Sequence, residues 1–190
     1  MPLPIEKEHY TFADYLEWNE DERIEMIDGE IIAMASPSSD HQRISGALFA
    51  QLYNYLEGKK CEVFAAPFDV RPFERDGDSP EDVTTVLQPD ISVVCDRSKT
   101  DNRGYKGTPD MVIEILSPST RRHDRLVKLN LYQKAGVREY WIVSPEEQTV
   151  EVLLLENGIL TLHEIYDKEA FVKVNVLANC GIDLSRVFPE

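Results

Sequence analysis

Residues 109–120 read PDMVIEILSPST, and the interpretation of the whole chain starts from this stretch. Five apolar residues lie between Asp110 and Ser117. They predict a strand buried on both faces, which Pro118 ends. Glu114 lies in the middle of this apolar run. A buried carboxylate is unfavourable unless it meets a cation, hydrogen-bond donors or a metal ion. Glu114 is therefore either a structural acid satisfied by donors or a metal ligand.

The residues after this strand predict a helix and another strand. Ser119 or Thr120 can cap a helix over 121–135, which ends at Gly136. Residues 137–145 are again apolar and predict a strand. Two strands joined through a helix form a right-handed parallel crossover. The passage 110–145 therefore predicts two parallel neighbours at the centre of a sheet.

The remaining pattern places further strands and helices around this crossover. Asp28-Gly29 and Asn157-Gly158 lie between apolar runs and are typical of hairpin turns. The predicted elements are a helix over 11–23 capped by Thr11, hairpins over 23–34 and 149–166, an amphipathic helix over 36–58, strands over 61–72 and 89–96, polar loops over 75–85 and 98–108, the second of them mobile, and a C-terminal strand followed by a helical turn. We expect one α/β (α+β) domain over 1–190, with a mixed central sheet flanked by helices. Its core spans about 36–145, and hairpins are added at both ends.

Composition excludes several classes of protein. With 42% hydrophobic and 9% aromatic residues, the chain is typical of a globular protein and not of a disordered one. No apolar stretch reaches the roughly 18 residues of a membrane span, and no secretory signal is read at the N-terminus, so we expect a cytoplasmic protein. Cys61, Cys95 and Cys180 form no CxxC pair, so we expect free core cysteines and not a disulfide framework.

The charge of the chain is unevenly distributed. The net charge of −15 argues against binding nucleic acid, whose phosphates attract positive charge. However, residues 97–138 carry ten Lys/Arg and four acidic residues, which is a net +6 around Glu114 and leaves −21 on the remainder. This segment is either a basic binding face or an ordinary solvated loop and helix surface.

Asp90 and Glu114 form the candidate constellation. Asp90 opens one predicted strand, and Glu114 lies inside the next. If these strands are neighbours, the two carboxylates repel by about 4 kcal/mol at about 4 Å, unless a proton, a basic side chain or a divalent cation lies between them. Carboxylate oxygens suit Mg²⁺ and Mn²⁺. Asp124, Lys128 and Tyr132 share one helix stripe, so Lys128 either points toward the acids or forms an ordinary surface pair with Asp124.

These motifs together resemble a known family. The motifs RIEMIDGE, QPDISVV, PDMVIEILSPST, KLxxY and GVREYWIV are similar to the Uma family of bacterial restriction-endonuclease-like proteins, and the resemblance runs over residues 11–166. More broadly, Asp followed by Glu on the next strand resembles the PD-(D/E)xK nucleases. The resemblance implies a restriction endonuclease-like fold and a Mg²⁺- or Mn²⁺-dependent endonuclease that cleaves nucleic acid, most simply DNA. It also implies a homodimer or higher homo-oligomer and no membrane association.

The resemblance implies roles for particular residues. Asp90 matches the PD aspartate and Glu114 the second acid, so both are implied metal ligands and catalytic residues. Leu116 stands where the family pattern has its lysine, and Lys128 on the next helix is the replacement. Asp110 follows a proline as well, but it opens the same strand as Glu114 and is interpreted as the start of that strand.

The segments that resemble the family contain further candidate site residues. Glu25 and His41 lie in matching segments and are candidates for the metal shell. Alternatively, Glu25 is an exposed strand residue and His41 a capping or surface histidine. Arg121, Arg122 and Arg125 are the expected phosphate contacts. Ser117 and Ser119 of SPST lack a histidine placed to activate them, so turn and capping roles explain these serines. No Gly-rich phosphate loop of Walker or Rossmann spacing is present.

Three functions remain open from the sequence. The first is metal-dependent hydrolysis of nucleic acid by Asp90, Glu114 and Lys128. The second is a nuclease-like fold that no longer cleaves and serves as a binding or assembly module, which Leu116 and the overall acidity favour. The third is a structural or oligomerisation domain whose acids pair with arginines. The fold by itself does not choose among them.

Overall fold

The computed structural model describes residues 7–18, 23–118 and 120–189, and a mixed sheet of six strands forms its centre. The strand order is β11–β10–β9–β8–β5–β3. The strands are β3 (Glu62–Ala65), β5 (Ile91–Val94), β8 (Met111–Ile115), β9 (Glu139–Ser144), β10 (Thr149–Glu156) and β11 (Ile159–Asp167). β8 and β9 are parallel, and the other neighbours are antiparallel. The mixed sheet and its parallel pair at the centre confirm the prediction.

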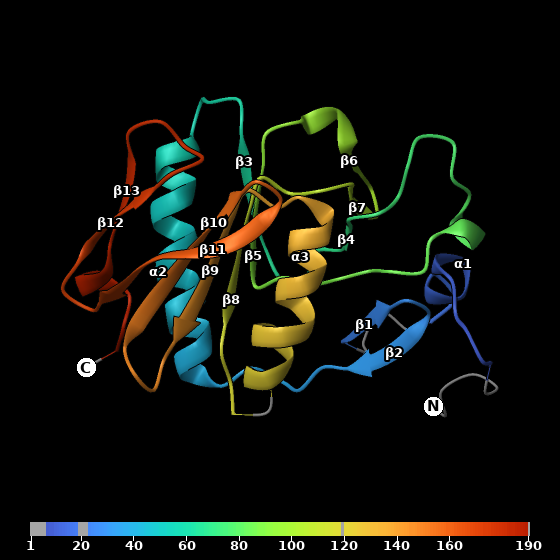
Figure 1. The fold of residues 1–190 in the computed structure, drawn as a ribbon, viewed down its shortest axis with the longest axis horizontal. Helices are drawn as coiled ribbons and strands as arrows, with labels where there is room; N and C mark the ends of the chain where they lie inside the picture. Colours follow the sequence, from blue (N-terminus) through green and yellow to red (C-terminus); the bar gives the residue numbers. More distant parts are fainter. Residues whose placement is uncertain (1–6, 19–22, 119, 190) are drawn as a thin grey trace.

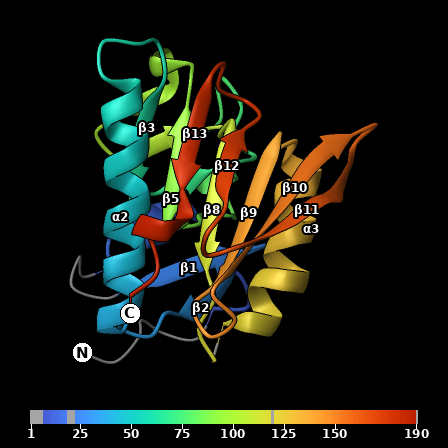
Figure 2. The same cartoon turned by 90° about the vertical axis from the view of Figure 1, so that its left-hand side faces the viewer.

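Helices cover both faces of this sheet. α2 (Ser39–Leu56) lies on one face, and a π-helical segment η3 (His123–Lys128) continuing into α3 (Leu129–Ala135) lies on the other (Figure 2). The second helix connects β8 to β9 and ends at Gly136 in the left-handed conformation, as predicted. Within the described residues, no helix is long and apolar enough to cross a membrane.

Smaller elements surround the central layers (Figure 1). They are α1 (Phe12–Tyr15), β1 (Ile24–Ile27), β2 (Glu30–Ala33), β4 (Val70–Arg71), η1 (Pro80–Asp82), η2 (Arg97–Lys99), β6 (Thr100–Asp101), β7 (Gly104–Lys106), β12 (Phe171–Val174), β13 (Cys180–Asp183) and η4 (Leu184–Arg186). β1 and β2 form the predicted N-terminal hairpin, and β10 and β11 the predicted C-terminal one. Asp28, Gly29, Asn157 and Gly158 all have positive φ, as this hairpin turn requires.

The alternation of side chains along β8 explains how Glu114 is placed. Met111, Ile113 and Ile115 point into the core beneath α2. Val112 and Leu116 belong to the core beneath α3. Because successive strand residues point to opposite faces, Glu114 lies on the α3 face between two apolar neighbours. On α2, Ile44, Leu48, Leu52 and Leu56 are all buried, which confirms the predicted apolar stripe.

Several element boundaries differ from the prediction. α1 ends at Tyr15 and not near residue 23, although Thr11 does cap it; residues 19–22 lie outside the described residues. The expected strand over 61–72 is two strands, β3 and β4, with Pro67 between them, because proline has no N–H for a sheet. The loop expected over 98–108 contains η2 and the paired strands β6 and β7. The C-terminal strand is a hairpin, β12 with β13.

The cysteine prediction is wrong for two of the three residues. Cys61, before β3, and Cys95, after β5, are joined by a disulfide bond. Because β3 and β5 are antiparallel neighbours, the start of one strand lies beside the end of the other. The sequence separation of 34 residues gave no indication of this proximity. Cys180 is a free, buried cysteine, as expected.

Candidate active site

Asp90 and Glu114 face each other across two paired strands. β5 and β8 pair with Ile91 opposite Ile113. Continuing this antiparallel register by one residue places Asp90 opposite Glu114, on the α3 face of the sheet. Side chains in such positions are direct neighbours. The backbone N–H of Ile115 also donates a hydrogen bond of 2.7 Å to Oδ2 of Asp90. The two strand-borne acids predicted from the sequence therefore lie together.

Glu114 is held by two donors from the helix that follows its strand. Nζ of Lys128 lies 2.9 Å from Oε1 of Glu114, and the hydroxyl of Tyr132 donates to the same oxygen at 2.5 Å. All three side chains are buried. The predicted helix stripe thus points toward the sheet and not toward solvent. The interpretation of Lys128 as a surface residue is wrong.

Lys128 lies among three carboxylates. Besides Glu114, its amine is 2.9 Å from Oε1 of Glu25 and 3.8 Å from Oδ1 of Asp124. Asp124 and Lys128 belong to the π-helical segment η3, in which the N–H of Leu129 bonds to the carbonyl of Asp124. Such segments are frequent at functional sites. We call Glu25, Asp90, Glu114, Asp124 and Lys128 the acid cluster.

Burial and like charges shift the pKa values in the acid cluster. Burial raises the pKa of Glu114 well above its usual value; Lys128 opposes this shift, and Asp124, Asp90 and Glu25 add to it. Burial likewise raises the pKa of Asp124. Burial by itself would lower the pKa of Lys128, but Glu114, Glu25 and Asp124 outweigh it and raise that pKa. The amine is therefore charged, and the acids compete for its single charge.

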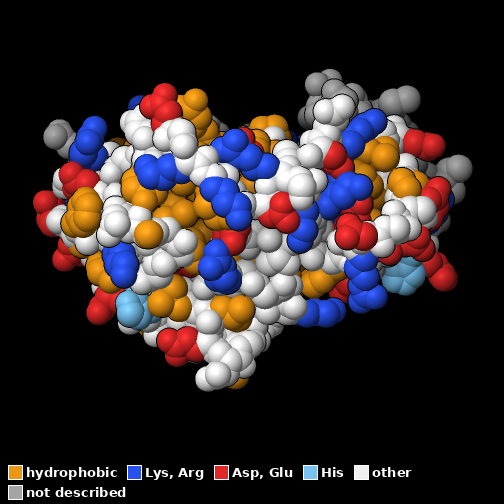
Figure 3. Space-filling view, turned by 90° about the horizontal axis from the view of Figure 1, so that it is seen from above, with side chains coloured by type: hydrophobic (Ala, Val, Ile, Leu, Met, Phe, Trp, Pro, Cys, Tyr) orange, Lys and Arg blue, Asp and Glu red, His pale blue; other side chains and the backbone are white. Residues whose placement is uncertain are grey.

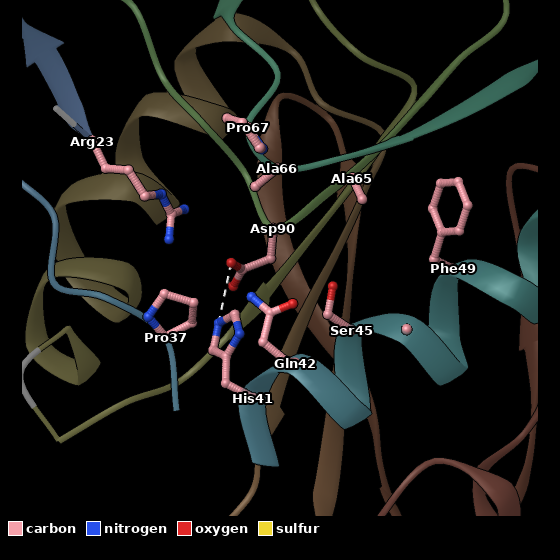
Figure 4. Close-up of a pocket in the computed structure, with 11 residues that line it drawn as sticks. Arg23, Pro37, His41, Gln42, Ser45, Phe49, Ala65, Ala66, Pro67 and Asp90 are labelled. Atoms are coloured by element: carbon pink, nitrogen blue, oxygen red, sulfur yellow. Dashed lines mark ion pairs between the residues drawn. The ribbon is translucent and has the colours of Figure 1, made fainter. Parts of the chain in front are cut away.

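Asp90 has a separate partner on α2. Nε2 of His41 lies 3.1 Å from Oδ1 of Asp90 (Figure 4). Ser38 caps α2 by accepting from the backbone N–H of His41, which fixes the first helical turn beside β5. His41 therefore contacts a candidate metal ligand, and it is not simply a capping or surface residue. Its Nδ1 is buried without a hydrogen-bond partner.

Glu25 enters the acid cluster because the N-terminal hairpin docks on the segment before β5. Met26 and Val86 exchange two backbone hydrogen bonds of 2.8 and 2.7 Å. One residue away, Oε1 of Glu25 accepts from the backbone N–H of Gln88 at 2.8 Å. Glu25 is 1% exposed, so the interpretation of this residue as an exposed strand position is wrong.

A cleft of about 550 Å³ opens beside the acid cluster, at the end of the molecule where α2 begins. Its lining includes Asp90, Glu114 and Lys128 from the candidate site and residues 34–38 after the hairpin. Of the three arginines expected to bind phosphate, Arg121 lines the cleft and pairs with Glu146 at 2.6 Å. Arg122 is exposed. Arg125 forms two hydrogen bonds to Glu151 on β10.

Most of the chain matches a known protein family. Residues 12–185 match the family model Uma2, described as "Putative restriction endonuclease". The chain belongs to the Uma2 family. Two uncharacterized proteins of Synechocystis sp., slr1290 and sll1609, are 31% and 30% identical to it. The matches cover 73% of this chain and 70% of slr1290, and 70% of this chain and 73% of sll1609.

A solved structure shares the fold of this Uma2 family member. The crystal structure of a "putative nuclease belonging to DUF820" from Anabaena variabilis superposes with a TM-score of 0.73 and 22% sequence identity. The match covers 94% of this chain and 97% of the Anabaena chain. At this identity the likeness shows the fold, which is the mixed α/β architecture predicted from the sequence.

Two other buried or partly buried acids show how the acid cluster differs from structural carboxylates in the same chain. Glu139 on β9 accepts from Nε1 of Trp141 and from the backbone N–H of Val176, both at 2.8 Å. Asp110 accepts from the backbone N–H of Cys95 and pairs with Arg138. Each is satisfied by donors away from the cleft. Asp110 is thus the start of its strand, as predicted.

The carboxylate oxygens of the acid cluster are ligands of the type that suits a hard divalent cation. Three carboxylates lie around the amine of Lys128, and Asp90 lies opposite one of them, so carboxylates outnumber the single lysine in the cluster. Oxygen ligands of this kind are those that Mg²⁺ and Mn²⁺ prefer. Nevertheless, among the described residues no three His, Cys, Asp or Glu side chains are arranged to hold a metal ion. The amine of Lys128 lies between two of the acids.

Proposed function

We propose that this protein is a metal-dependent endonuclease that hydrolyses phosphodiester bonds of nucleic acid, with DNA as the substrate. The observation that carries the proposal is the opposition of Asp90 and Glu114 at the wall of a cleft, with Lys128 against Glu114. Membership of the Uma2 family supports a nuclease-like function. The arrangement of two strand-borne acids and a lysine resembles a PD-(D/E)xK site in which the lysine has moved to the following helix.

The proposed roles follow from the contacts of each residue. Asp90 and Glu114 would hold Mg²⁺ or Mn²⁺, which when bound polarises a phosphate and acidifies water. His41 and the N–H of Ile115 hold the two oxygens of Asp90 in place. Tyr132 and Lys128 do the same for Oε1 of Glu114. Orientation by neighbours of this kind is needed for both ligand geometry and affinity.

Lys128 has the central position in the chemistry. Its amine remains charged because three acids surround it. A buried ammonium group next to the reacting phosphate would orient the attacking water and stabilise negative charge that develops during hydrolysis. Glu25 positions this amine from the side of the hairpin. In this proposal Arg122, which is exposed, and Arg121, which lines the cleft, would contact flanking phosphates, and Arg121 would have to leave Glu146 to do so. Arg125 would have to leave Glu151 to do so, and its role as a phosphate contact is the weakest of the three.

A non-cleaving binding or assembly module is the second candidate function. It is favoured by the lack of a ready metal-binding group among the described residues and by Leu116 at the expected lysine position. Such a module would still bind an anionic partner through the cleft, but Asp90 and Glu114 would have no catalytic task. For the endonuclease we expect a homodimer or higher homo-oligomer, because cutting both strands of a duplex usually employs two sites.

Cleavage assays on matched variants test the proposal. Supercoiled plasmid and short single-stranded DNA are incubated at low salt with Mg²⁺ or Mn²⁺ and with purified wild-type, Asp90→Asn, Glu114→Gln or Asp110→Asn protein. The first two substitutions keep side-chain shape and remove the charge of a proposed metal ligand. Asp110→Asn is the control, because this second aspartate of a Pro-Asp pair lies outside the acid cluster.

We expect metal-dependent cleavage by the wild-type and Asp110→Asn proteins and a loss of at least about 10²-fold in the two site variants. Equal cleavage by all four proteins would identify a contaminating nuclease and refute the assignment. No cleavage by any of them, across plasmid, duplex and single-stranded substrates, would support the non-cleaving module. Circular dichroism of each variant establishes that the comparison is made between folded proteins.

A further inference from the structure

The cations that line the cleft are mostly neutralised within the protein. The basic side chains of the lining are Arg23, Arg121 and Lys128. Lys128 is surrounded by the carboxylates of the acid cluster, and Arg121 pairs with Glu146. A charge that is already paired attracts a further anion weakly. An anionic substrate that approaches the acid cluster therefore needs another positive group.

Arg23 differs from the other two basic side chains. Within the part of the chain that the structure describes, it forms no ion pair with a carboxylate, and its Nε is buried without a hydrogen-bond partner. Its backbone carbonyl accepts from the N–H of Met34, which fixes it at the base of the N-terminal hairpin. In Figure 4 the side chain of Arg23, which directly precedes β1, extends toward Asp90. A buried donor without a partner is unfavourable, and an acceptor on a ligand in the cleft would satisfy it.

Arg23 lies where two clefts meet. A smaller cleft of about 340 Å³ runs between α2 and the end of β3. Arg23, Pro37, His41 and Asp90 line both this cleft and the larger one. A chain-like molecule that occupies both clefts therefore passes Arg23 and Asp90 together. Small ligands confined to one cleft would not need this continuity.

The overall negative charge of the protein makes a single well-placed cation more important. On the face at the end where α2 finishes, which is opposite the cleft, Lys and Arg side chains lie among Asp and Glu side chains (Figure 3). The protein as a whole carries −15. Because the protein is acidic overall, affinity for nucleic acid has to come from specific phosphate contacts.

We propose that the guanidinium group of Arg23 binds a phosphodiester group of the nucleic-acid strand at the junction of the two clefts, next to Asp90. This inference rests on the proposed function and adds to it the residue that receives the substrate phosphate. The planar guanidinium offers parallel N–H donors that match two phosphate oxygens, which an ammonium group does not. Arg23 thus contacts substrate, whereas Lys128 acts inside the acid cluster. The strand runs through both clefts.

Binding of labelled DNA tests this assignment without requiring cleavage. Fluorescence anisotropy measures the affinity of a short single-stranded oligonucleotide in Ca²⁺, over a series of salt concentrations. The proteins are wild type, Arg23→Ala, Arg23→Lys and Arg43→Ala. Arg43 is the matched control: it lies on α2 near His41, carries the same charge, is exposed, and pairs with Asp40 at 2.7 Å. A second oligonucleotide with uncharged methylphosphonate linkages is used in parallel.

We expect Arg23→Ala to weaken binding by about tenfold or more, since a charge-assisted pair of hydrogen bonds is lost. The slope of log affinity against log salt should fall by about 0.7, as for one phosphate contact on a single strand. Arg23→Lys should recover part of the affinity, and Arg43→Ala should match the wild type. The difference between wild type and Arg23→Ala should disappear on the uncharged oligonucleotide. Thermal unfolding of each variant checks that the fold is retained.

Several outcomes would overturn the assignment. They are equal affinity and salt slope for Arg23→Ala and wild type, an equal loss in Arg43→Ala, or no binding of the wild type. The proposed function fails separately. If the wild-type protein binds through Arg23 but does not cleave in Mg²⁺ or Mn²⁺, the phosphate site stands and the endonuclease does not. If the wild type cleaves and Arg23→Ala cleaves equally well, the endonuclease stands and the phosphate site does not.

Discussion

Replacing Lys128 by methionine tests the electrostatic balance of the acid cluster. The substitution keeps an unbranched side chain of similar length and removes the charge. Lys128 is 2% exposed and lies 2.9 Å from both Glu25 and Glu114. At an effective dielectric constant of about 20, each of these pairs attracts by about 6 kcal/mol before desolvation is subtracted. Removing one partner of a buried ion pair typically destabilises a protein by about 3–5 kcal/mol.

The destabilisation caused by Lys128→Met should depend on pH in a defined direction. The carboxyl pKa values of Glu114 and Asp124 are raised in the folded protein, so the folded state binds more protons than the unfolded state. Their contribution to stability is present at acid pH and is lost as pH rises through the folded pKa. Without the charge of Lys128 these pKa values rise further. The free energy difference between Lys128→Met and wild type should therefore be large at pH 8 and smaller at pH 5.

Urea unfolding at pH 5, 6.5 and 8 measures this difference directly, and thermal unfolding gives a second measure. A loss of about 3–5 kcal/mol corresponds to a fall of about 6–20 °C in Tm for a domain of this size. Lys168→Met is the matched control, because Lys168 is exposed and should change stability by less than about 0.5 kcal/mol. If Lys128→Met loses no stability at pH 8, or loses the same amount at every pH, the account of the acid cluster is refuted.

Two further predictions concern single contacts. Tyr132→Phe removes the hydroxyl that donates to Glu114 and should lower the free energy of unfolding, measured in urea, by about 1–3 kcal/mol. Tyr53→Phe is the control, because this ring is exposed and its substitution should not change stability. Equal effects of the two substitutions would contradict the contact. Gly104→Ala would place a Cβ 2.0 Å from the carbonyl oxygen of Asp69 at a φ of +119°, and should destabilise by about 1–3 kcal/mol. Gly46 lies in α2, and a Cβ added there would have no neighbouring atom within 4 Å, so Gly46→Ala should instead stabilise the protein by about 1 kcal/mol. A Gly104→Ala protein more stable than Gly46→Ala would refute this reasoning.

Local pattern was sufficient for the elements that frame the site. Both hairpin turns, the apolar stripe of α2 and the strand–helix–strand passage from 110 to 145 were predictable, because each depends on residues close together in sequence. Element ends were less predictable: α1 is shorter than its pattern, and the strand over 61–72 is divided. Tertiary contacts decide where such short elements end, and local propensity is too weak to do so.

Some residues of the candidate site could likewise be selected from the sequence, whereas their roles could not be established from it. Asp90, Glu114 and Lys128 could be selected from the sequence because charged residues in or beside a buried strand are costly and therefore conspicuous. Asp124 and Tyr132 could be recognised as members of the same helix stripe as Lys128. Their roles as metal ligands and catalytic residues remain predictions, as do the roles of the three arginines.

The sequence by itself therefore determined the mixed α/β architecture and the strand-borne acids at its centre. Only the tertiary structure decided that Glu25 is buried against Lys128, that His41 meets Asp90, and that Arg23 extends into the cleft without an acidic partner. It also decided the pairing of Cys61 with Cys95. The physical reason is that these contacts join segments far apart in the chain. Which distant segments dock together depends on the packing of the whole core, and local sequence pattern carries no record of it.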